Sequence, residues 1–310
     1  MAKLSIIIPC YFNEQNIPVT TKILFENEVN FPSEVEFEYI FVDDGSKDNT
    51  WLEIVKQTVI APEKVKAIKL VANVGSYSAV VAGMEYATGD FNVILAADLQ
   101  DPPELMVEMY QHWKAGFKLV IGNRQDRQDS WGQKIFANSF HFLMQKFALH
   151  NIPSGGFDYV MFDREISSKL VALQEKNTNI FYLMAWMGYA YVNIPYTRKK
   201  REIGKSRWTT RKKIKLFVDS FVSFSYFPVR LISVAGILLG FIALLYGFTV
   251  IINRLVGSVA IEGWSALMVV ILFVSAFQMI ALGIIGEYVW RGLDASKNRP
   301  MYIVDKLISK

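Results

Sequence analysis

The chain has 310 residues, 52% of them hydrophobic, and a formal net charge of +4 at pH 7. Its mean hydropathy of +0.23 is high for a soluble domain, and its length allows one domain or two. The small charge excess does not indicate nucleic acid, so we expect no such partner. The single cysteine, Cys10, excludes an internal disulfide and a cysteine-based zinc cluster. We expect no signal peptide, because the apolar segment 4–9 is short and continues as a strand pattern.

Short apolar segments alternate with helical patterns through the N-terminal third. Residues 4–9, 37–42 and 65–70 have the composition of buried strands. This β–α–β repetition predicts an α/β fold with a parallel sheet and crossover helices. Polar residues follow every strand and therefore share one edge of the sheet. Each cluster alone could be a helix cap, but together they favour a binding crevice.

The most informative segment ends an apolar strand at Asp98, Gln100 and Asp101, directly before two prolines that open a helix. A carboxylate at the carboxyl end of a strand lies where α/β sheets bind ligands. Carboxylate and amide oxygens suit Mg²⁺ or Mn²⁺, and these ions bind diphosphates. The pattern predicts a metal–nucleotide site; the competing interpretation is an acidic turn that caps the helix.

The last third of the chain contains two long apolar runs. Residues 231–252 form an uncharged run of about 22 residues, enough to span roughly 30 Å of hydrocarbon as a helix. A second span is expected at about 266–287, with a short linker between the two. Two buried core helices would need a larger surrounding domain, so we expect a transmembrane hairpin within 228–290. Lys and Arg flank the hairpin but are nearly absent from its linker, which predicts that both chain ends are cytoplasmic.

Residues 208–227 precede the hairpin and combine basic residues with apolar residues at helical spacing. Such a helix beside a span is expected to lie in the membrane interface; the alternative is an ordinary surface helix. The predicted organisation is an α/β domain over 1–207, this amphipathic helix, the hairpin, and a cytoplasmic tail over 291–310.

Several motifs then occur in a fixed order along the chain. They are Pro9 with Asn13-Glu14, then Val42–Ser46, Asn73–Gly75, Ala87–Asp90 and Asp98–Pro102. Together they resemble the inverting family-2 glycosyltransferases with a Rossmann-like GT-A fold. More narrowly, nearly the whole chain resembles the polyprenyl-phosphate glycosyltransferases, which include dolichol-phosphate mannose synthase and the bactoprenol glucosyltransferases. The resemblance implies that the nucleoside of a nucleotide-sugar is bound by Pro9, Asn13, Glu14, Asp44 and Asn73.

The resemblance also implies a metal site with one departure from the family pattern. The usual Asp-x-Asp-Leu-Gln-Asp assigns the metal to Asp98 and Gln100, with Asp98 also in the catalytic set, but the first acid is replaced by Ala96. This loss either weakens the metal, makes its binding depend on the diphosphate, or gives the role to Asp101. We expect Mg²⁺ or Mn²⁺ to be required.

The remaining candidates concern the acceptor and the leaving group. Asp158 matches the family's catalytic base, although a turn aspartate is the alternative. Arg124 and Arg127 resemble arginines that bind the acceptor phosphate. A basic loop that resembles one folding over the donor carries Arg201, Lys205 and Arg207. The alternative for this loop is a juxtamembrane charge run that binds anionic lipid.

These features together predict an inverting hexosyltransferase of the bacterial inner membrane, in an O-antigen or other cell-envelope role. It is expected to transfer a sugar, most simply from UDP-glucose, to undecaprenyl phosphate at the cytoplasmic face. The resemblance further implies a homotetramer and a flippase partner. One alternative is a processive polysaccharide synthase, but Gly204 occupies the position of its Gln-x-x-Arg-Trp glutamine. The other is a non-catalytic membrane scaffold with a degenerate nucleotide site, which Ala96 would suit.

Overall fold

The computed structural model describes most of the chain and divides it into two units. The described residues are 1–124, 142–149, 158–199, 210–256 and 263–309. The first unit comprises Met1–Ser220 and Pro300–Lys310, and the second comprises Phe221–Arg299.

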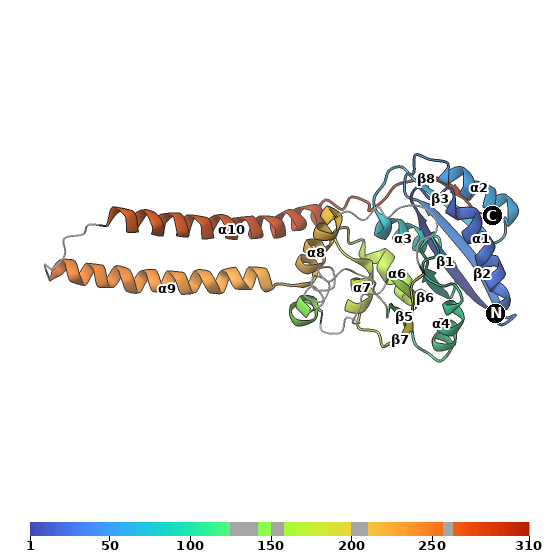
Figure 1. Ribbon diagram of the computed structural model, residues 1–310, viewed down its shortest axis with the longest axis horizontal. Coiled ribbons are helices and arrows are strands. Elements are labelled where there is room, and N and C mark those ends of the chain that lie inside the picture. The colour runs from blue at the N-terminus through green and yellow to red at the C-terminus, as the bar shows by residue number, and fades with distance from the viewer. Residues whose placement is uncertain (125–141, 150–157, 200–209, 257–262, 310) are drawn as a thin grey trace. The chain divides into compact units, whose positions relative to one another are not determined.

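Among the described residues, the first unit is built on an eight-stranded sheet of order β7-β5-β6-β4-β1-β2-β3-β8 (Figure 1). The strands are β1 (Ala2–Cys10), β2 (Val35–Asp43), β3 (Val65–Leu70), β4 (Phe91–Ile94), β5 (Leu119–Arg124), β6 (Tyr159–Asp163), β7 (Tyr191–Tyr196) and β8 (Val304–Ile308). Strands β4, β1, β2 and β3 are parallel, as are β5 and β7. Strand β6 is antiparallel to both β4 and β5, and β8 is antiparallel to β3. The expected α/β fold with a parallel centre is therefore confirmed.

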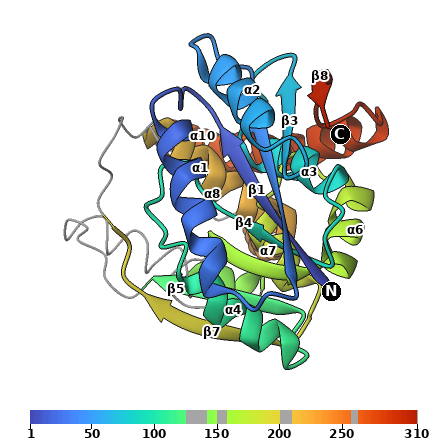
Figure 2. The same ribbon diagram turned by 90° about the vertical axis from the view of Figure 1, so that its right-hand side faces the viewer.

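Helices cover both faces of this sheet (Figure 2). They are α1 (Asn16–Asn27), the short 3₁₀ turn η1 (Glu28–Asn30), α2 (Thr50–Ile60), α3 (Ser76–Glu85), α4 (Leu105–Lys114), α6 (Arg164–Leu173) and α7 (Ile180–Trp186). Strand β1, at the centre of the sheet, is buried from Leu4 to Ile8, and its side chains are therefore mostly apolar on both faces. Leu4 and Ile6 of β1 share a core with Met109 of α4. On the opposite face Gly83 of α3 lies so close to Ile7 that an added Cβ would come within 2.5 Å of its Cγ2.

The C-terminal segment differs from the expected tail, because it returns to the sheet. Helix α10 continues to Ser296, and Val304–Ile308 then pairs with β3 as the edge strand β8. The Val71 N–H donates to the Ile303 carbonyl at 3.0 Å. The Tyr302 hydroxyl donates to Glu85. A short edge strand with a mostly exposed surface has little hydrophobic pattern, so the sequence did not predict it.

The second unit consists of two long helices and the residues just before them. Helices α9 (Phe227–Leu255) and α10 (Trp264–Ser296) run antiparallel (Figure 1). Their apolar parts cover 27 and 31 residues, which is long enough to cross a membrane by length and composition. Inside this unit, the Tyr288 hydroxyl donates to the Ser225 carbonyl at 2.7 Å. Helix α8 (Thr210–Phe224) precedes α9.

Candidate active site

The turns after β2 and β3 are joined through one buried carboxylate. Asp44 is 3% exposed and accepts from the Asn73 side-chain amide at 2.7 Å. It also accepts from the backbone N–H groups of Val74 at 2.7 Å and Gly75 at 3.0 Å. Gly45 permits this approach: its φ is +67°, and an added Cβ would lie 2.6 Å from the backbone of the facing turn. These contacts fix two adjacent strand ends relative to each other.

The turn after β1 is held in a similar way. The Asn13 side-chain oxygen accepts from the Tyr11 N–H at 2.8 Å, and the Asn13 N–H donates to the Thr50 hydroxyl at 2.8 Å. Glu14 accepts from the Asn49 N–H at 3.0 Å. The structure therefore brings Asn13, Glu14, Asp44 and Asn73 to the carboxyl ends of neighbouring strands, with Pro9 inside β1 opposite Val42. Their role toward a nucleoside stays a prediction.

Asp43 is a further candidate that the sequence interpretation passed over in favour of Asp44. It is the last residue of β2 and is fully buried. One carboxylate oxygen accepts from the Ser46 N–H at 3.0 Å, whereas Oδ2 has no hydrogen-bond partner among the described groups. Buried polar atoms are rarely left unsatisfied, and exceptions concentrate at functional sites. The only sequence signal for Asp43 was that it stands next to Asp44 in the motif Val42–Ser46.

The loop between β4 and α4 is anchored at both ends. The Thr20 hydroxyl donates to the Ala97 carbonyl at 2.7 Å, and the Asn27 side chain donates to the Pro103 carbonyl at 2.9 Å. Between these anchors Leu99 has a φ of +49°, a left-handed conformation that is uncommon for a leucine. The loop is therefore held in one shape by α1, and that shape positions the two predicted metal ligands.

Those predicted ligands are adjacent in this loop. The Asp98 carboxylate accepts from the Gln100 N–H at 3.3 Å, and the Gln100 side-chain amide donates to the Lys199 carbonyl at 3.3 Å. Within the part of the chain that the structure describes, no group of three or more His, Cys, Asp or Glu side chains could hold a metal ion. The role of Asp98 and Gln100 toward a metal ion therefore stays a prediction. Ala96, half-buried in the same loop, offers no oxygen from its side chain.

Asp101 had been one alternative for the missing carboxylate, and its contacts argue against that role. It is 2% exposed and accepts from the Tyr196 hydroxyl at 2.6 Å. Its Oδ1 also lies 3.3 Å from the Arg198 Nε. Burial, followed by the nearby charge of Asp158, raises the pKa of Asp101. The Asp101 carboxylate therefore binds Tyr196 of β7 and Arg198 just after it.

The predicted base and one predicted phosphate ligand form an ion pair. Arg124 ends β5 and Asp158 directly precedes β6, so antiparallel pairing brings them to the same sheet edge. The Arg124 Nη2 lies 2.6 Å from both carboxylate oxygens of Asp158. Burial alone would lower the pKa of Arg124, but the Asp158 carboxylate and Tyr196 together outweigh burial and raise it. The Asp158 side chain remains 45% exposed.

Arg198 completes this cluster and was given no role from the sequence. Its Nη1 lies 3.7 Å from the Asp158 carboxylate, and its Nε faces Asp101. Arg198 opens the basic run before the predicted loop, which is the only sequence signal for it. Its partners are far apart in the chain: Asp101 lies in the loop between β4 and α4, and Asp158 directly precedes β6. The other basic candidates, Arg127, Arg201, Lys205 and Arg207, lie outside the described residues.

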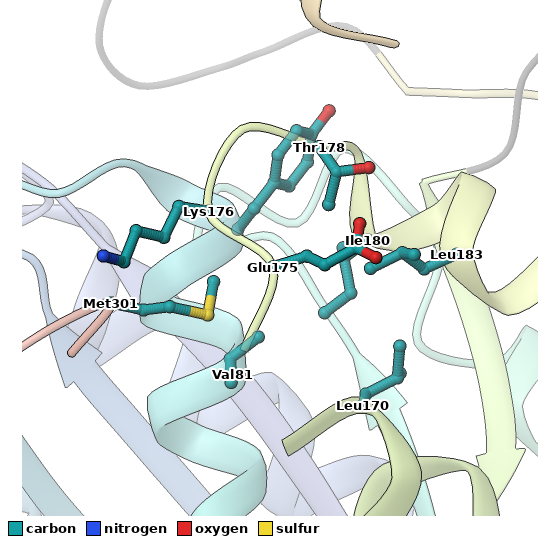
Figure 3. Close-up of a pocket in the computed structure, with 9 residues that line it drawn as sticks. Val81, Leu170, Glu175, Lys176, Thr178, Ile180, Leu183 and Met301 are labelled. Atoms are coloured by element: carbon teal, nitrogen blue, oxygen red, sulfur yellow. The ribbon is translucent and has the colours of Figure 1, made fainter. Parts of the chain in front are cut away.

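A small cavity near α3, α6 and α7 does not qualify as a substrate site (Figure 3). Its lining comprises Tyr77, Val81, Leu170, Glu175, Lys176, Thr178, Ile180, Leu183 and Met301. Its volume of about 10 Å³ has room for a single water molecule. Burial raises the pKa of Glu175 there, and the Thr178 hydroxyl has no partner among described groups. One ordered water is the largest guest that this space would accept.

Comparison with known proteins agrees with the fold and the motifs. Residues 5–171 match the family described as Glycosyl transferase family 2. The chain is 37% identical over 303 residues to the uncharacterized glycosyltransferase YkcC of Bacillus subtilis (strain 168), covering 97% of this chain and 93% of that protein. It is 32% identical over 305 residues to the SfII prophage-derived bactoprenol glucosyl transferase of Shigella flexneri, covering 98% of each.

The chain therefore belongs to glycosyltransferase family 2. It is a glycosyltransferase with a GT-A-like α/β domain, as the motifs predicted. A third relative, the uncharacterized glycosyltransferase sll0501 of Synechocystis, is 32% identical over 306 residues and covers 98% of this chain and 95% of its own length.

Proposed function

We propose that this protein transfers a sugar from a nucleotide-sugar to a polyprenyl phosphate, with UDP-glucose as donor and undecaprenyl phosphate as acceptor. The observation that carries the proposal is the cluster of Arg124, Arg198 and Asp158 at the same sheet edge as the predicted nucleoside-binding residues. Guanidinium groups suit a phosphate acceptor. The bactoprenol glucosyl transferase of Shigella flexneri, similar over 98% of both chains, supports the acceptor class.

The donor would lie across the carboxyl ends of β1 to β4. Its nucleoside would contact Asn13, Glu14, Asp44 and Asn73 next to Pro9. Asp98 and Gln100 would hold Mg²⁺ or Mn²⁺ on the diphosphate, where the ion neutralises the charge that develops on the leaving group. Arg201, Lys205 and Arg207 would add positive charge around the same diphosphate.

The reaction would be a single displacement. An oxygen of the lipid phosphate forms a bond to the anomeric carbon while the bond from that carbon to the nucleoside diphosphate breaks, which inverts the configuration. A phosphate monoester has its second pKa near about 6 and is largely dianionic at neutral pH. Most acceptor molecules therefore carry no phosphate proton for Asp158 to remove, and the role of Asp158 would be to orient the acceptor.

The membrane arrangement is part of the same proposal. The two apolar helices would form a transmembrane hairpin, because their length and composition suit a bilayer. Helix α8, with Arg211, Lys212, Lys213 and Lys215 in its sequence, would lie in the interface and meet the lipid acceptor there. The positive residues that flank the hairpin favour a cytoplasmic catalytic domain and termini. A homotetramer and a flippase partner are proposed from the family resemblance alone.

Purified full-length protein in detergent, given labelled UDP-glucose, Mg²⁺ and undecaprenyl phosphate, provides the test. The expected result is one glycolipid that carries a single sugar. A parallel series with other UDP- and GDP-sugars and with dolichyl phosphate tests the choice of donor and lipid. Polymeric product would favour a processive synthase. Nucleotide binding without any lipid product would contradict the proposal and favour the scaffold alternative.

A further inference from the structure

The carboxylate of Asp158 lies between Arg124, the last residue of β5, and Arg198, which follows β7. The Arg124 Nη2 is 2.6 Å from each of its oxygens, and the Arg198 Nη1 is 3.7 Å from Oδ2. Both arginine side chains are largely buried, at 18% and 23% exposure, whereas Asp158 is 45% exposed. The anion is therefore the most accessible member of this cluster.

Asp158 contacts only part of the hydrogen-bonding surface of these two arginines. Its contact with Arg124 involves the single nitrogen Nη2. The buried Nε of Arg124 has no hydrogen-bond partner in the described part of the chain, whereas the Nε of Arg198 faces Asp101 at 3.3 Å. A guanidinium carries five N–H donors, and a phosphate offers three strong acceptor oxygens with up to two negative charges. A phosphate is thus a better match for these two groups than one carboxylate.

Arg198 is held in place independently of Asp158. Its Nε lies 3.3 Å from Oδ1 of the buried Asp101, which also accepts from the Tyr196 hydroxyl at 2.6 Å. Displacement of Asp158 would leave this contact intact. Tyr196 and Asp101 therefore act as positioning residues for Arg198.

We propose that the Asp158 carboxylate and the acceptor phosphate compete for Arg124 and Arg198, so that acceptor binding exchanges one anion for another. This inference rests on the proposed function, because it assigns the phosphate to the lipid acceptor. The exchange avoids leaving either guanidinium buried without a counter-charge. It also frees the Asp158 carboxylate, which can turn toward solvent because its side chain is already 45% exposed.

The test is equilibrium binding of inorganic phosphate, and then of farnesyl phosphate, to the full chain in detergent. Asp158→Asn removes the competing charge and should tighten binding by about threefold to tenfold, because a larger fraction of the protein then has the site open. Arg198→Gln should weaken it at least about tenfold while UDP affinity is unchanged. The controls are the exposed Asp305→Asn and Arg164→Gln, which should match the wild type.

Unchanged or weaker phosphate binding by Asp158→Asn would overturn the competition, as would failure of the wild type to bind either phosphate. Asp158→Ser serves as the second variant should Asp158→Asn unfold. The outcomes separate from those of the proposed function because binding needs no sugar donor. Tighter binding by Asp158→Asn, together with a wild type that forms no glycolipid, would preserve the competition and reject the function. Glycolipid formation by the wild type, without tighter phosphate binding by Asp158→Asn, would support the function and reject the competition.

Discussion

The side-chain amide of Asn73 donates to the carboxylate of Asp44 at 2.7 Å, and this bond joins the turn after β3 to the turn after β2. Both turns lie at the carboxyl edge of the parallel strands, where a nucleotide is expected. A side chain that binds ligand well is normally fixed before the ligand arrives, which lowers the entropy lost on binding. The Asp44–Asn73 contact would provide such preorganisation for the predicted nucleoside site.

Replacement of Asn73 by Ala should therefore weaken UDP binding by about tenfold. It should also lower the free energy of unfolding by about 1 to 2 kcal/mol, because the Asn73 amide donates two hydrogen bonds to Asp44. Asp44 keeps its two backbone donors, so the fold should survive. Titration calorimetry with UDP and urea unfolding measure the two effects. Asn193→Ala, at an exposed position of β7, is the control. UDP affinity equal to that of the control would remove Asn73 from the donor site.

Glu38 should make stability depend on acid pH. It is 2% exposed and is hydrogen-bonded or ion-paired to Lys66, Ser5 and Thr88. Burial acts to raise the pKa of Glu38, but these partners together lower it to about 2. The unfolded pKa is about 4.3, so the stabilisation is complete above about pH 5 and is lost as pH falls toward 2.

The Glu38→Gln variant should lose about 3 kcal/mol of unfolding free energy at neutral pH and show a flatter pH dependence between about pH 5 and 2. Chemical unfolding at pH 7 and pH 3 provides the comparison. Glu36→Gln is the matched control, because Glu36 lies two residues away on β2 and is exposed. Equal pH slopes for wild type and Glu38→Gln would show that this carboxylate is not strongly coupled to folding.

Asp158→Asn should slow sugar transfer by about 10²- to 10⁴-fold, the usual cost of losing a positioned acid–base or orienting group. Asn retains the size of the side chain and loses its charge, and UDP affinity should be unchanged. Turnover and UDP binding are measured on the same preparation, with Asp305→Asn as the control. Full turnover would assign Asp158 to the turn alone, and loss of UDP binding would place it at the donor.

Activity should require Mg²⁺ or Mn²⁺ and disappear in excess EDTA, since Asp98 and Gln100 offer oxygen ligands beside the expected diphosphate. Ala96→Asp restores the first acid of the family pattern and should tighten Mn²⁺ binding measured with UDP present. Full turnover in excess EDTA would contradict the requirement for a metal ion. Unchanged Mn²⁺ affinity in Ala96→Asp would show that this position does not face the ion.

Removal of the chain after Tyr226 should leave a domain that binds UDP but uses long-chain lipid poorly. This truncation also deletes β8, so the outer edge of β3 loses its partner.

Reattaching residues 297–310 to the truncated domain through a flexible linker should raise its free energy of unfolding by at least about 1 kcal/mol, because the backbone hydrogen bonds between β3 and β8 return. The linker alone is the control. Equal stabilities would show that β8 contributes nothing to this domain.

The sequence by itself determined the class of fold and the sheet edge at which the candidate site residues lie. The apolar strands and the polar residues that follow them are local patterns, and local patterns can be read along the chain. The same is true of the two long apolar helices. Asp98, Gln100, Asp44 and Asn73 lie where these patterns placed them, even though their ligands stay predictions.

Only the tertiary structure decided which of these residues act on one another. Strand β8 was not predicted because its signal is pairing with a distant strand, and an edge strand needs few buried side chains. Arg198 reaches Asp101 and Asp158 because β7 pairs with β5, while β6 lies on the other side of β5. Such contacts join residues widely separated in the chain. Their energy depends on distance and burial, which no local sequence pattern specifies.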